Sequence, residues 1–515
     1  MRFSSVVSAV FGLCIGTTLS SAEQSNLTTP QSTQRILAGD FKPAPVFENT
    51  NLVRTINLEK GYVRETTNVL VTNIDKSPQS EYYIPFDSDL VGKIGGFDAR
   101  DKKQAARGQL EVSIAALADV LDAQTPSSKS IHYYIIHLTE PLQPKDAVTL
   151  SISYHIQGAL KPLPVSIKQD EKQYLTYNFS AYVPTVYPTI KQKTKVKFPS
   201  ADVPKYTTTT GLTSASDPEK QGSSLTYGPY DTPKIPPGTV YPVAVRYEFN
   251  KPLLTCSLLE RDVEVSHWGG NLATEERYWL HHDGAKLANH FSRVAYSTQN
   301  YYINAGQMTT SALRELKVPL KPGSVDAYFT DEIGNVSTSR FRPNSIREAS
   351  LELKPRYPLF GGWNYTFRIG WNNDLSSSLR KLQTPPDTYI LSVPLIEGPK
   401  NLEGIQYEKL VFRVILPEGA TNVKYQTHGG TGVPSLHAEH SLHKTFMDTL
   451  GRTELKLTTT NVVDEARDVT ILVTYQYSFL AGLRKPFTVF AGVAVVFVVA
   501  FLVGRVDTSI GKRKK

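Results

Sequence analysis

Short runs in which hydrophobic and polar residues alternate recur along most of this chain. A clear example has four apolar residues at alternate positions: Val148, Leu150, Ile152 and Tyr154. This period of two is typical of a half-buried β-strand. One segment, residues 101–123, has a helical period instead, with apolar residues at positions 110, 114, 117 and 121. The pattern therefore predicts a mainly β fold with one helical insertion.

Two longer apolar segments lie near the ends of the chain. Residues 6–19 follow Arg2 and precede Ser20-Ser21-Ala22, which predicts a secretory signal peptide over residues 1–22. Residues 487–504 carry no charge, and at about 1.5 Å per residue a helix there would span roughly 27 Å, which suits a thin endoplasmic reticulum bilayer. We therefore predict a single-pass type I membrane protein with a lumenal ectodomain and a short basic cytosolic tail, residues 505–515.

Four segments of the first half resemble four segments of the second half in the same order. The pairs are 52–58 with 259–265, 141–156 with 358–371, 195–206 with 413–425, and 243–249 with 471–477. The offset within a pair grows from 207 to 228 residues, as insertions in loops would produce. We predict two tandem β-sandwich-like lumenal domains of similar topology, residues 23–250 with the helical insertion and residues 251–480. Two Gly/Ser/Pro-rich stretches, 213–239 and 374–400, are predicted as long loops.

Charge and cysteine content limit the classes of partner and of fold. The formal net charge of the 515 residues is +8, of which Arg2 contributes +1 and the tail +4, so +3 remains for the rest. A value this small excludes nucleic acid as an expected partner. Since Cys14 lies in the predicted signal peptide, Cys256 has no partner for an internal disulfide in the mature chain. We expect Cys256 to be a buried thiol, with a mixed disulfide to another protein as the alternative.

No segment carries a recognised catalytic motif such as GxSxG, HExxH or a Walker sequence. The densest set of potential metal ligands is His437, Glu439, His440 and His443. Their spacing differs from the i, i+4 pair of zinc helices, and flanking glycine and proline predict a solvated loop. Asp87 and Asp89 flank Ser88 in a polar turn; such a pair can hold a divalent cation but is a common coincidence. We therefore predict no catalytic, cofactor-binding or metal-binding residue.

Three other features are candidates for interaction or modification. One strand-like run has lysine at alternate positions: Lys191, Lys193, Lys195 and Lys197. On a strand these lysines would share one face, which could face a lipid headgroup, a diphosphate or an acidic partner; a solvated or edge-protecting face is the alternative. The glycosylation candidates are the N-x-[ST] sequons at Asn335, Asn364, Asn178 and Asn26. In the apolar C-terminal segment, small residues at 491, 492 and 494 would let another helix approach closely.

Several distinctive runs of the second half resemble those of the ribophorin I family. These runs are EVSHWG at 264–269, DEIGNVSTS at 331–339, PRYPLFGGW at 355–363 and LPEGA at 416–420. Shorter similarities occur in the first half at 187–189, 195–197 and 228–230, so the resemblance extends from about residue 45 through the C-terminal apolar segment. Ribophorin I is the large single-span subunit of the dolichyl-diphosphooligosaccharide–protein glycosyltransferase, or oligosaccharyltransferase, complex.

The resemblance implies a non-catalytic subunit, without a cofactor, beside a multi-span catalytic subunit in the endoplasmic reticulum membrane. That complex transfers a preassembled oligosaccharide from dolichyl diphosphate to the asparagine of N-x-S/T in nascent polypeptides. Other subunits of the complex are the expected partners, with nascent polypeptide and the translocon as further candidates, and Asn335 is the sequon most expected to carry a glycan. The tail resembles that of fungal-type, short-tailed members. The alternative function is a stand-alone type I lumenal binding protein or chaperone of the secretory pathway.

Overall fold

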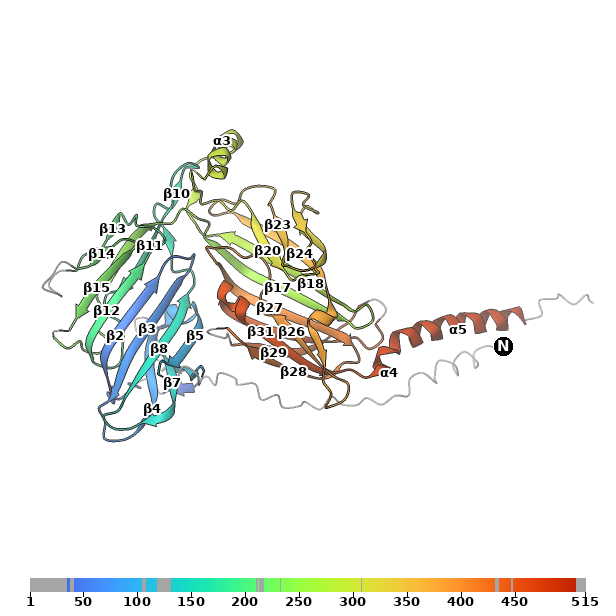
Figure 1. Cartoon of the computed structure of the whole chain (residues 1–515), viewed down its shortest axis with the longest axis horizontal. Helices are drawn as coiled ribbons and strands as arrows, with labels where there is room; N and C mark the ends of the chain where they lie inside the picture. The colour runs from blue at the N-terminus through green and yellow to red at the C-terminus, as the bar shows by residue number, and fades with distance from the viewer. Residues whose placement is uncertain are drawn as a thin grey trace, which may run out of the picture. The chain divides into compact units, whose positions relative to one another are not determined.

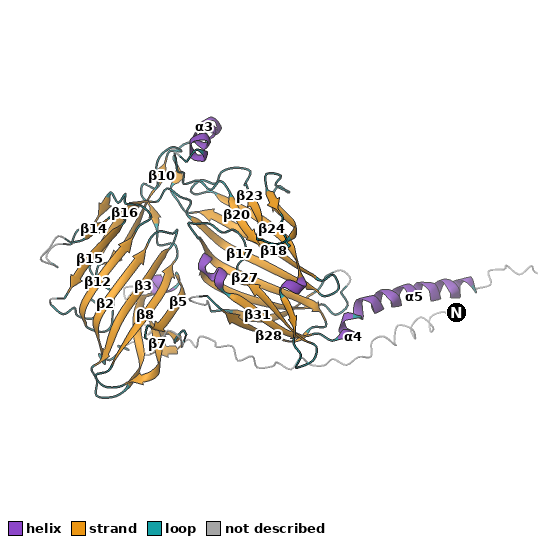
Figure 2. Ribbon diagram, viewed as in Figure 1, coloured by secondary structure: helices purple, strands orange, loops and turns teal. Residues whose placement is uncertain are grey.

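The structure is a computed structural model that describes residues 35–37, 41–103, 108–117, 131–209, 212, 217–231, 233–306, 308–430, 435–445 and 448–505. The predicted signal peptide and residues 506–515 of the predicted tail lie outside the described residues. Within them, strands dominate and helices are few (Figure 2), so the expected mainly β fold with minor α content is confirmed.

Each half of the chain is built around a seven-stranded sheet (Figure 1). The first has the order β14-β15-β12-β2-β3-β8-β5 and the second the order β29-β30-β27-β17-β18-β24-β21. The strands of the first sheet are β2 (Phe47–Asn57), β3 (Val63–Asn73), β5 (Ile94–Asp101), β8 (Ala147–Ile156), β12 (Thr189–Lys197), β14 (Glu219–Gln221) and β15 (Ser224–Tyr230). Those of the second are β17 (Leu254–Ser266), β18 (Asn271–His282), β21 (Val325–Asp331), β24 (Asn364–Asp374), β27 (Ile405–Glu418), β29 (His437–His443) and β30 (Arg452–Val463).

The two sheets correspond strand by strand. In both, neighbouring strands are antiparallel except for one central pair, β2 with β12 and β17 with β27, which are parallel. The segments that resemble each other in sequence occupy equivalent places, since residues 52–57 lie in β2 and residues 259–265 in β17. The expectation of two tandem β-sandwich-like domains of similar topology is therefore confirmed.

Two smaller sheets in each half complete the sandwiches. In the first half their orders are β13-β16-β11-β9 and β1-β6-β7-β4, and in the second half β28-β31-β26-β25 and β22-β23-β20. The first-half strands are β1 (Arg35–Leu37), β4 (Gln79–Asp87), β6 (Glu111–Leu117), β7 (Ile131–Leu142), β9 (Lys161–Pro162), β11 (Tyr174–Ser180), β13 (Lys205–Tyr206) and β16 (Pro242–Glu248). The second-half strands are β20 (Leu316–Leu320), β22 (Arg340–Arg342), β23 (Ala349–Leu353), β25 (Leu379–Lys381), β26 (Thr388–Pro394), β28 (Thr421–His428) and β31 (Thr470–Gln476). β10 (Ser166–Ile167) pairs with β19 (Lys286–Leu287) across the two halves.

Alternating side chains explain why these segments pair as sheets. Along β18 every second residue is buried: Leu272, Thr274, Glu276, Tyr278, Leu280 and His282. The inward side chains of the long sheet pack against those of its covering sheets and form separate cores in the first half and in the second half. In the second half, for example, Leu259 of β17 shares a core with Val393 of β26 and Leu351 of β23.

The helical elements are short apart from two. They are α2 (Ser88–Val91), α3 (Arg293–Asn304), α4 (Phe479–Gly482), α5 (Arg484–Gly504) and the 3-10 helices η2 (Leu375–Ser377) and η3 (Asp464–Asp468). Ser292 caps α3, because its hydroxyl accepts a hydrogen bond from the backbone N–H of Ala295. α5 is long and apolar enough to cross a membrane, and it contains the predicted span 487–504.

Three sequence predictions about local structure are wrong. The helix expected over residues 101–123 is contradicted because Glu111–Leu117 forms β6, which pairs with β1 and β7; residues 104–107 and 118–123 lie outside the described residues. The stretch 213–239 contains β14 and β15, and 374–400 contains β25 and β26, so neither is a continuous loop. In each case pairing with another strand overrides the local preference of the segment.

Polar contacts join the two halves. Two of them are hydrogen bonds to carboxylates, from Tyr62 Oη to Asp464 Oδ1 (2.9 Å) and from Arg64 Nη1 to Glu465 Oε1 (2.8 Å). Two are hydrogen bonds from side-chain amides to carbonyls, from Gln157 Nε2 to Val462 (2.7 Å) and from Gln406 Nε2 to Gly61 (2.9 Å). The fifth joins His155 Nε2 and the Asn461 carbonyl (2.8 Å). Burial lowers the pKa of His155, so this imidazole is neutral at pH 7 and donates to the carbonyl. The contact joins β3, β8 and the residues next to them to β27, β30 and η3.

Candidate functional site

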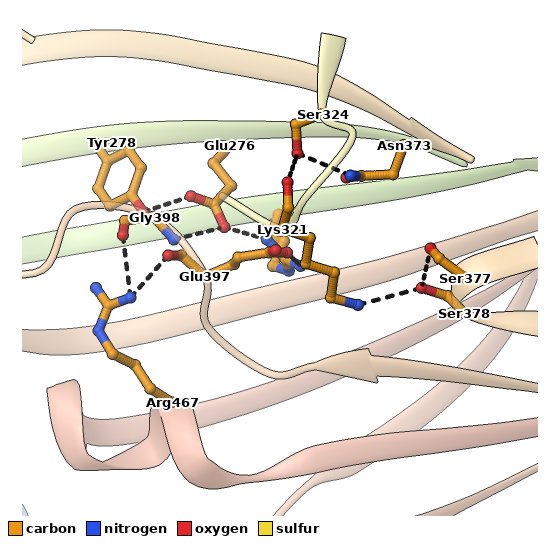
Figure 3. Close-up of polar contacts among 11 residues, drawn as sticks. Glu276, Tyr278, Lys321, Ser324, Asn373, Ser377, Ser378, Glu397, Gly398 and Arg467 are labelled. Atoms are coloured by element: carbon orange, nitrogen blue, oxygen red, sulfur yellow. Dashed lines mark hydrogen bonds and ion pairs between the residues drawn. The ribbon is translucent and has the colours of Figure 1, made fainter. Parts of the chain in front are cut away.

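A buried polar cluster lies in the second half (Figure 3). Arg261 of β17 is fully buried and bonds to Glu276 of β18 through Nη1 and to Glu397 Oε2 through Nη2 at 2.7 Å. Tyr278 donates to Glu276 Oε2 at 2.6 Å, and burial, with the Glu276 carboxylate next to it, raises the pKa of this phenol well above its usual value. The cluster thus pairs one guanidinium with two carboxylates inside a protein core.

Further bonds tie the loop after β26 to this cluster. Arg467 Nη1 donates to the carbonyl oxygens of Glu397 (2.7 Å) and Gly398 (3.0 Å), and the Gly398 N–H donates to Glu276 Oε1 at 3.3 Å. Figure 3 also shows a neighbouring group in which Lys321 Nζ donates to Ser378 Oγ at 3.2 Å. The charged groups of the cluster are therefore used to hold loop, strand and 3-10 helix together. That is a structural role, in which the charge of each group is balanced within the fold.

The histidine-rich segment is a strand. His437–His443 forms β29, the edge strand of the second long sheet, with His437, His440 and Glu439 exposed. The loop expected here is therefore wrong. Successive side chains of a strand point to opposite faces, so His440 lies on the other face from His437 and His443. In the part of the chain that the structure describes, no three His, Cys, Asp or Glu side chains are grouped so that they could hold a metal ion.

The remaining candidates from the sequence are placed as follows. Asp87 ends β4 and Asp89 lies in the first turn of α2, and both are exposed. Cys256 is fully buried in β17, as expected; burial raises its thiol pKa to about 12, so the unreactive protonated form prevails at neutral pH.

The four lysines do share one face of a strand. In β12, Lys191, Lys193 and Lys197 are exposed and Lys195 is half-buried, while the residues between them are mostly buried. β12 is paired on both sides, with β15 and with β2, so the edge-protecting alternative is wrong. Among the described residues no acidic side chain forms an ion pair with these lysines. We call this surface the lysine face.

Three of the four sequons are exposed, at Asn178 in β11, Asn335 and Asn364; Asn26 lies outside the described residues. The turn that carries Asn335 is fixed by Arg356, whose Nη2 donates to the Asn335 carbonyl at 3.0 Å and whose Nε bonds to Asp331 Oδ2 at 2.5 Å. The Asn364 side chain is already bonded to His281. Asn335 thus lies exposed on a fixed turn.

Sequence reasoning did not identify the junction between the second sandwich and α5. Trp268, in the turn between β17 and β18, is 69% exposed, and its Nε1–H donates to the Gly482 carbonyl of α4 at 2.8 Å. Lys485 of α5 bonds to Asp448 Oδ1 at 2.8 Å. The signal available in the sequence was the run EVSHWG at 264–269, which covers the last three residues of β17 and the start of the next turn, where a tryptophan precedes glycine.

Comparison with known proteins gives one consistent result. The family described as Ribophorin I matches residues 47–504. Subunit 1 of the dolichyl-diphosphooligosaccharide–protein glycosyltransferase of Caenorhabditis elegans is 32% identical over 481 residues, covering 92% of this chain and 75% of that protein. The subunit 1 protein of Schizosaccharomyces pombe is 29% identical over 451 residues, covering 86% of this chain and 92% of that protein. Subunit 1B of Arabidopsis thaliana is 30% identical over 477 residues, covering 92% of this chain and 96% of that protein.

Among solved structures, an M1 zinc metallopeptidase from Deinococcus radiodurans aligns over 43% of this chain and 42% of its own chain, with 12% identity and a TM-score of 0.23. A TM-score this low does not establish a common fold. The family match, in contrast, begins at the first residue of β2 and ends at the last residue of α5. It includes both long sheets and the membrane-spanning helix, and the chain therefore belongs to the ribophorin I family.

Proposed function

We propose that this chain is a non-catalytic subunit of the oligosaccharyltransferase complex, which transfers an oligosaccharide from dolichyl diphosphate to asparagine in N-x-S/T of nascent polypeptides. The observation that carries the proposal is the family match over residues 47–504 together with relatives named as subunit 1 of that transferase. The chain would act in the endoplasmic reticulum membrane, with residues 23–250 and 251–480 as two lumenal domains.

The use of the polar groups supports a structural contribution. Arg261 and Glu276 bond to each other and to the loop at Glu397. Catalytic acids and bases need access to a substrate, whereas these two groups are fully buried. In this proposal the chemistry belongs to a multi-span partner, and this chain supplies contact surfaces in the lumen and a helix in the bilayer.

Two surfaces are proposed for those contacts. On α5, Ala491 and Gly492 are exposed and Ala494 is half-buried, and small residues allow close packing against a helix of another subunit. On the first sandwich, the lysine face would attract an acidic partner, a diphosphate or lipid headgroups. Contact with nascent polypeptide or with the translocon is part of the same proposal and rests on the expected lumenal position of both domains.

Gentle detergent extraction tests the assignment. Solubilisation in digitonin and capture through an affinity tag on this chain should recover a large assembly that glycosylates an N-x-T peptide from a lipid-linked donor. Native mass spectrometry of that sample identifies the partners. Recovery of a monomer without transferase activity would contradict the proposal and favour a stand-alone lumenal binding protein or chaperone.

The lysine face can be tested in the same assembly. Replacing the four lysines of β12 by glutamine removes four positive charges from this face of the paired strand. If the face binds an anionic partner, the variant should lose subunits or donor affinity at lower salt than the wild type, because such attraction is screened by salt. An unchanged composition and unchanged salt dependence would contradict this part of the proposal.

A further inference from the structure

The start of the membrane-spanning helix is bonded to turns of the second sandwich. Trp268 Nε1–H donates to the Gly482 carbonyl at 2.8 Å, and Lys485 Nζ lies 2.8 Å from Asp448 Oδ1. The Asp448 side chain is fully buried and also pairs with Arg452 at 3.4 Å. Gly419 adopts a positive φ of 91°, and a Cβ there would lie 2.9 Å from the Ala481 Cβ. α4 is therefore docked onto the domain, and no free linker separates it from α5.

The EVSHWG run positions the tryptophan of this junction. Glu264, at its start, is paired with Arg452. His267 Nε2 lies 2.7 Å from the hydroxyl of Tyr475, and its ring also contacts Tyr389. With the histidine fixed among these aromatic rings, Trp268 projects outward at the end of the turn. The run thus links the sandwich core to α4.

Large apolar side chains around this junction are left exposed by the fold. They are Trp268 at 69%, Leu450 at 65%, Phe479 at 77% and Leu480 at 75%. They come from the β17–β18 turn, the β29–β30 turn and α4, so three separate segments present apolar surface at the same end of the sandwich. We call these four residues the junction patch.

The length of the connection places the junction patch at the level of the lipid headgroups. The predicted apolar span 487–504 begins at Phe487, five residues after Gly482, which is about 7.5 Å along a helix. The headgroup region extends roughly 5–8 Å beyond the hydrocarbon core on each side. With Phe487 at the edge of the hydrocarbon, α4 and the turns bonded to it lie in or against that region.

The chemistry of the junction fits a membrane surface. Tryptophan and other aromatic residues are enriched at the membrane–water boundary, and lysine or arginine near helix ends extend toward it. Arg484 and Lys485 lie between α4 and the uncharged part of α5. Beside Leu480, a groove of about 500 Å³ is lined by Arg484, Gln476 and Pro386 among others, which combines polar and apolar walls as a phospholipid headgroup and its glycerol require.

We propose that the second sandwich rests on the bilayer through the junction patch, with Trp268, Leu450, Phe479 and Leu480 in the headgroup region. The occupant is lipid, because the patch continues through α4 into the membrane-spanning helix, and turns of the sandwich are bonded to α4 at Gly482 and to α5 at Lys485. This inference depends on α5 crossing a membrane and is independent of the proposed function. Its consequence is that the domain has a fixed height and tilt above the membrane.

Nitroxide labelling of the full chain tests the inference. Cys256 is fully buried, so a cysteine introduced at an exposed position is labelled selectively. The test variants are Leu450→Cys and Leu480→Cys, and the control is Leu402→Cys, which is 88% exposed. Leu402 lies just before Ile405, which pairs with Leu254 at the start of β17. Trp268 follows the other end of β17. The strand has 13 residues, so its two ends are about 40 Å apart.

The variants are reconstituted in phosphatidylcholine vesicles, and collision of each label with oxygen and with a water-soluble nickel chelate is measured. Positions 450 and 480 should show an oxygen-to-nickel ratio several-fold higher than position 402. Equal ratios at the three positions would overturn the inference. So would exclusion of both reagents from positions 450 and 480 in the complex isolated from native membranes, because it would show that protein covers the patch.

A second measurement avoids new cysteines. Brominated phosphatidylcholine quenches tryptophans near the lipid, and the difference between wild type and Trp268→Phe isolates the signal of Trp268 from that of Trp279, Trp363 and Trp371. Quenching confined to Trp268 is expected. Equal fractional quenching in wild type and Trp268→Phe would overturn the inference.

Discussion

Replacement of Arg261 by methionine should strongly destabilise the second sandwich. Arg261 is fully buried between Glu276 and Glu397, and its guanidinium lies 6.0 Å from the ring of Trp371. Methionine has a similar length but no charge, so both carboxylates would lose their cationic partner. Glu276 would keep only the hydroxyl of Tyr278 and the N–H of Gly398. Loss of one partner from a buried ionic group costs about 3–5 kcal/mol of unfolding free energy.

Arg413→Met is the matched control. Arg413 also bonds to a carboxylate, with Nη2 2.9 Å from Asp262 Oδ2, but its side chain is 27% exposed and that of Asp262 is 28% exposed. Water screens such a pair, so its loss should cost about 0.2–1 kcal/mol. Both variants remove an arginine from the second long sheet, and they differ mainly in burial.

Tryptophan fluorescence in urea measures this difference selectively. All four tryptophans of the chain, at 268, 279, 363 and 371, lie in the second half, so the signal reports on that sandwich. With a denaturant slope of about 3 kcal/mol per M, a loss of 3–5 kcal/mol lowers the urea midpoint by roughly 1–1.7 M, and the control by less than about 0.3 M. The full chain in detergent is the sample.

A midpoint for Arg261→Met within 0.3 M of wild type would refute the reasoning, since the buried carboxylates would then not depend on the guanidinium. Adding Glu276→Gln to Arg261→Met gives a further check. It removes one unpaired carboxylate, so the double variant should recover part of the loss. A larger loss than in the single variant would also contradict the argument.

Three further predictions concern the joint between the halves, pH and glycosylation. Gly95→Ala should increase hydrogen exchange in β5 and β30, because the added Cβ would lie 1.8 Å from a carbonyl oxygen of β30. The control Gly92→Ala should leave exchange unchanged, because a Cβ there would have no atom within 4 Å. Equal exchange in the two variants would contradict this prediction. Burial lowers the pKa of His282 to about 4, whereas in the unfolded chain it is roughly 6.5. The fold therefore has its full stability above pH 6.5, where the imidazole is neutral in both states. As the pH falls toward 4, up to about 3.4 kcal/mol of unfolding free energy is lost. The urea midpoint should therefore fall less between pH 7 and pH 4 in His282→Gln than in wild type, and parallel curves would exclude this cause. Asn335→Gln should remove one glycosidase-sensitive step in gel mobility, and unchanged mobility would show that this sequon is unoccupied.

Several local predictions succeeded because the information lies within a few residues. The alternation of lysines in β12 requires only a period of two, and their common face follows from it. The apolar segment in α5 is visible from composition. The repeated order of segments was sufficient to predict two similar domains, and the matching strand orders agree with it.

Sequence predictions failed where pairing with another strand decides the local structure of a segment. Ile114 was assigned to a helix by its spacing. It lies instead in β6, which pairs with β7, and the neighbouring Ala115 is buried. The histidines at 437–443 were assigned to a loop, yet β30 provides a full antiparallel partner for them. The lysine face was considered a possible edge, and pairing of Lys193 with Val53, 140 positions earlier, makes it central.

The sequence by itself therefore determined the class of fold, the duplication, the membrane-spanning helix and the family, since each is carried by local periodicity or by runs of residues in order. The tertiary structure decided which charges are paired and where the domain meets its anchor. Arg261 and Glu397 are 136 positions apart and Trp268 and Gly482 are 214 apart. Contacts at such separations depend on how strands from the whole half-chain are ordered in the sheets, and no local pattern of residues encodes that order.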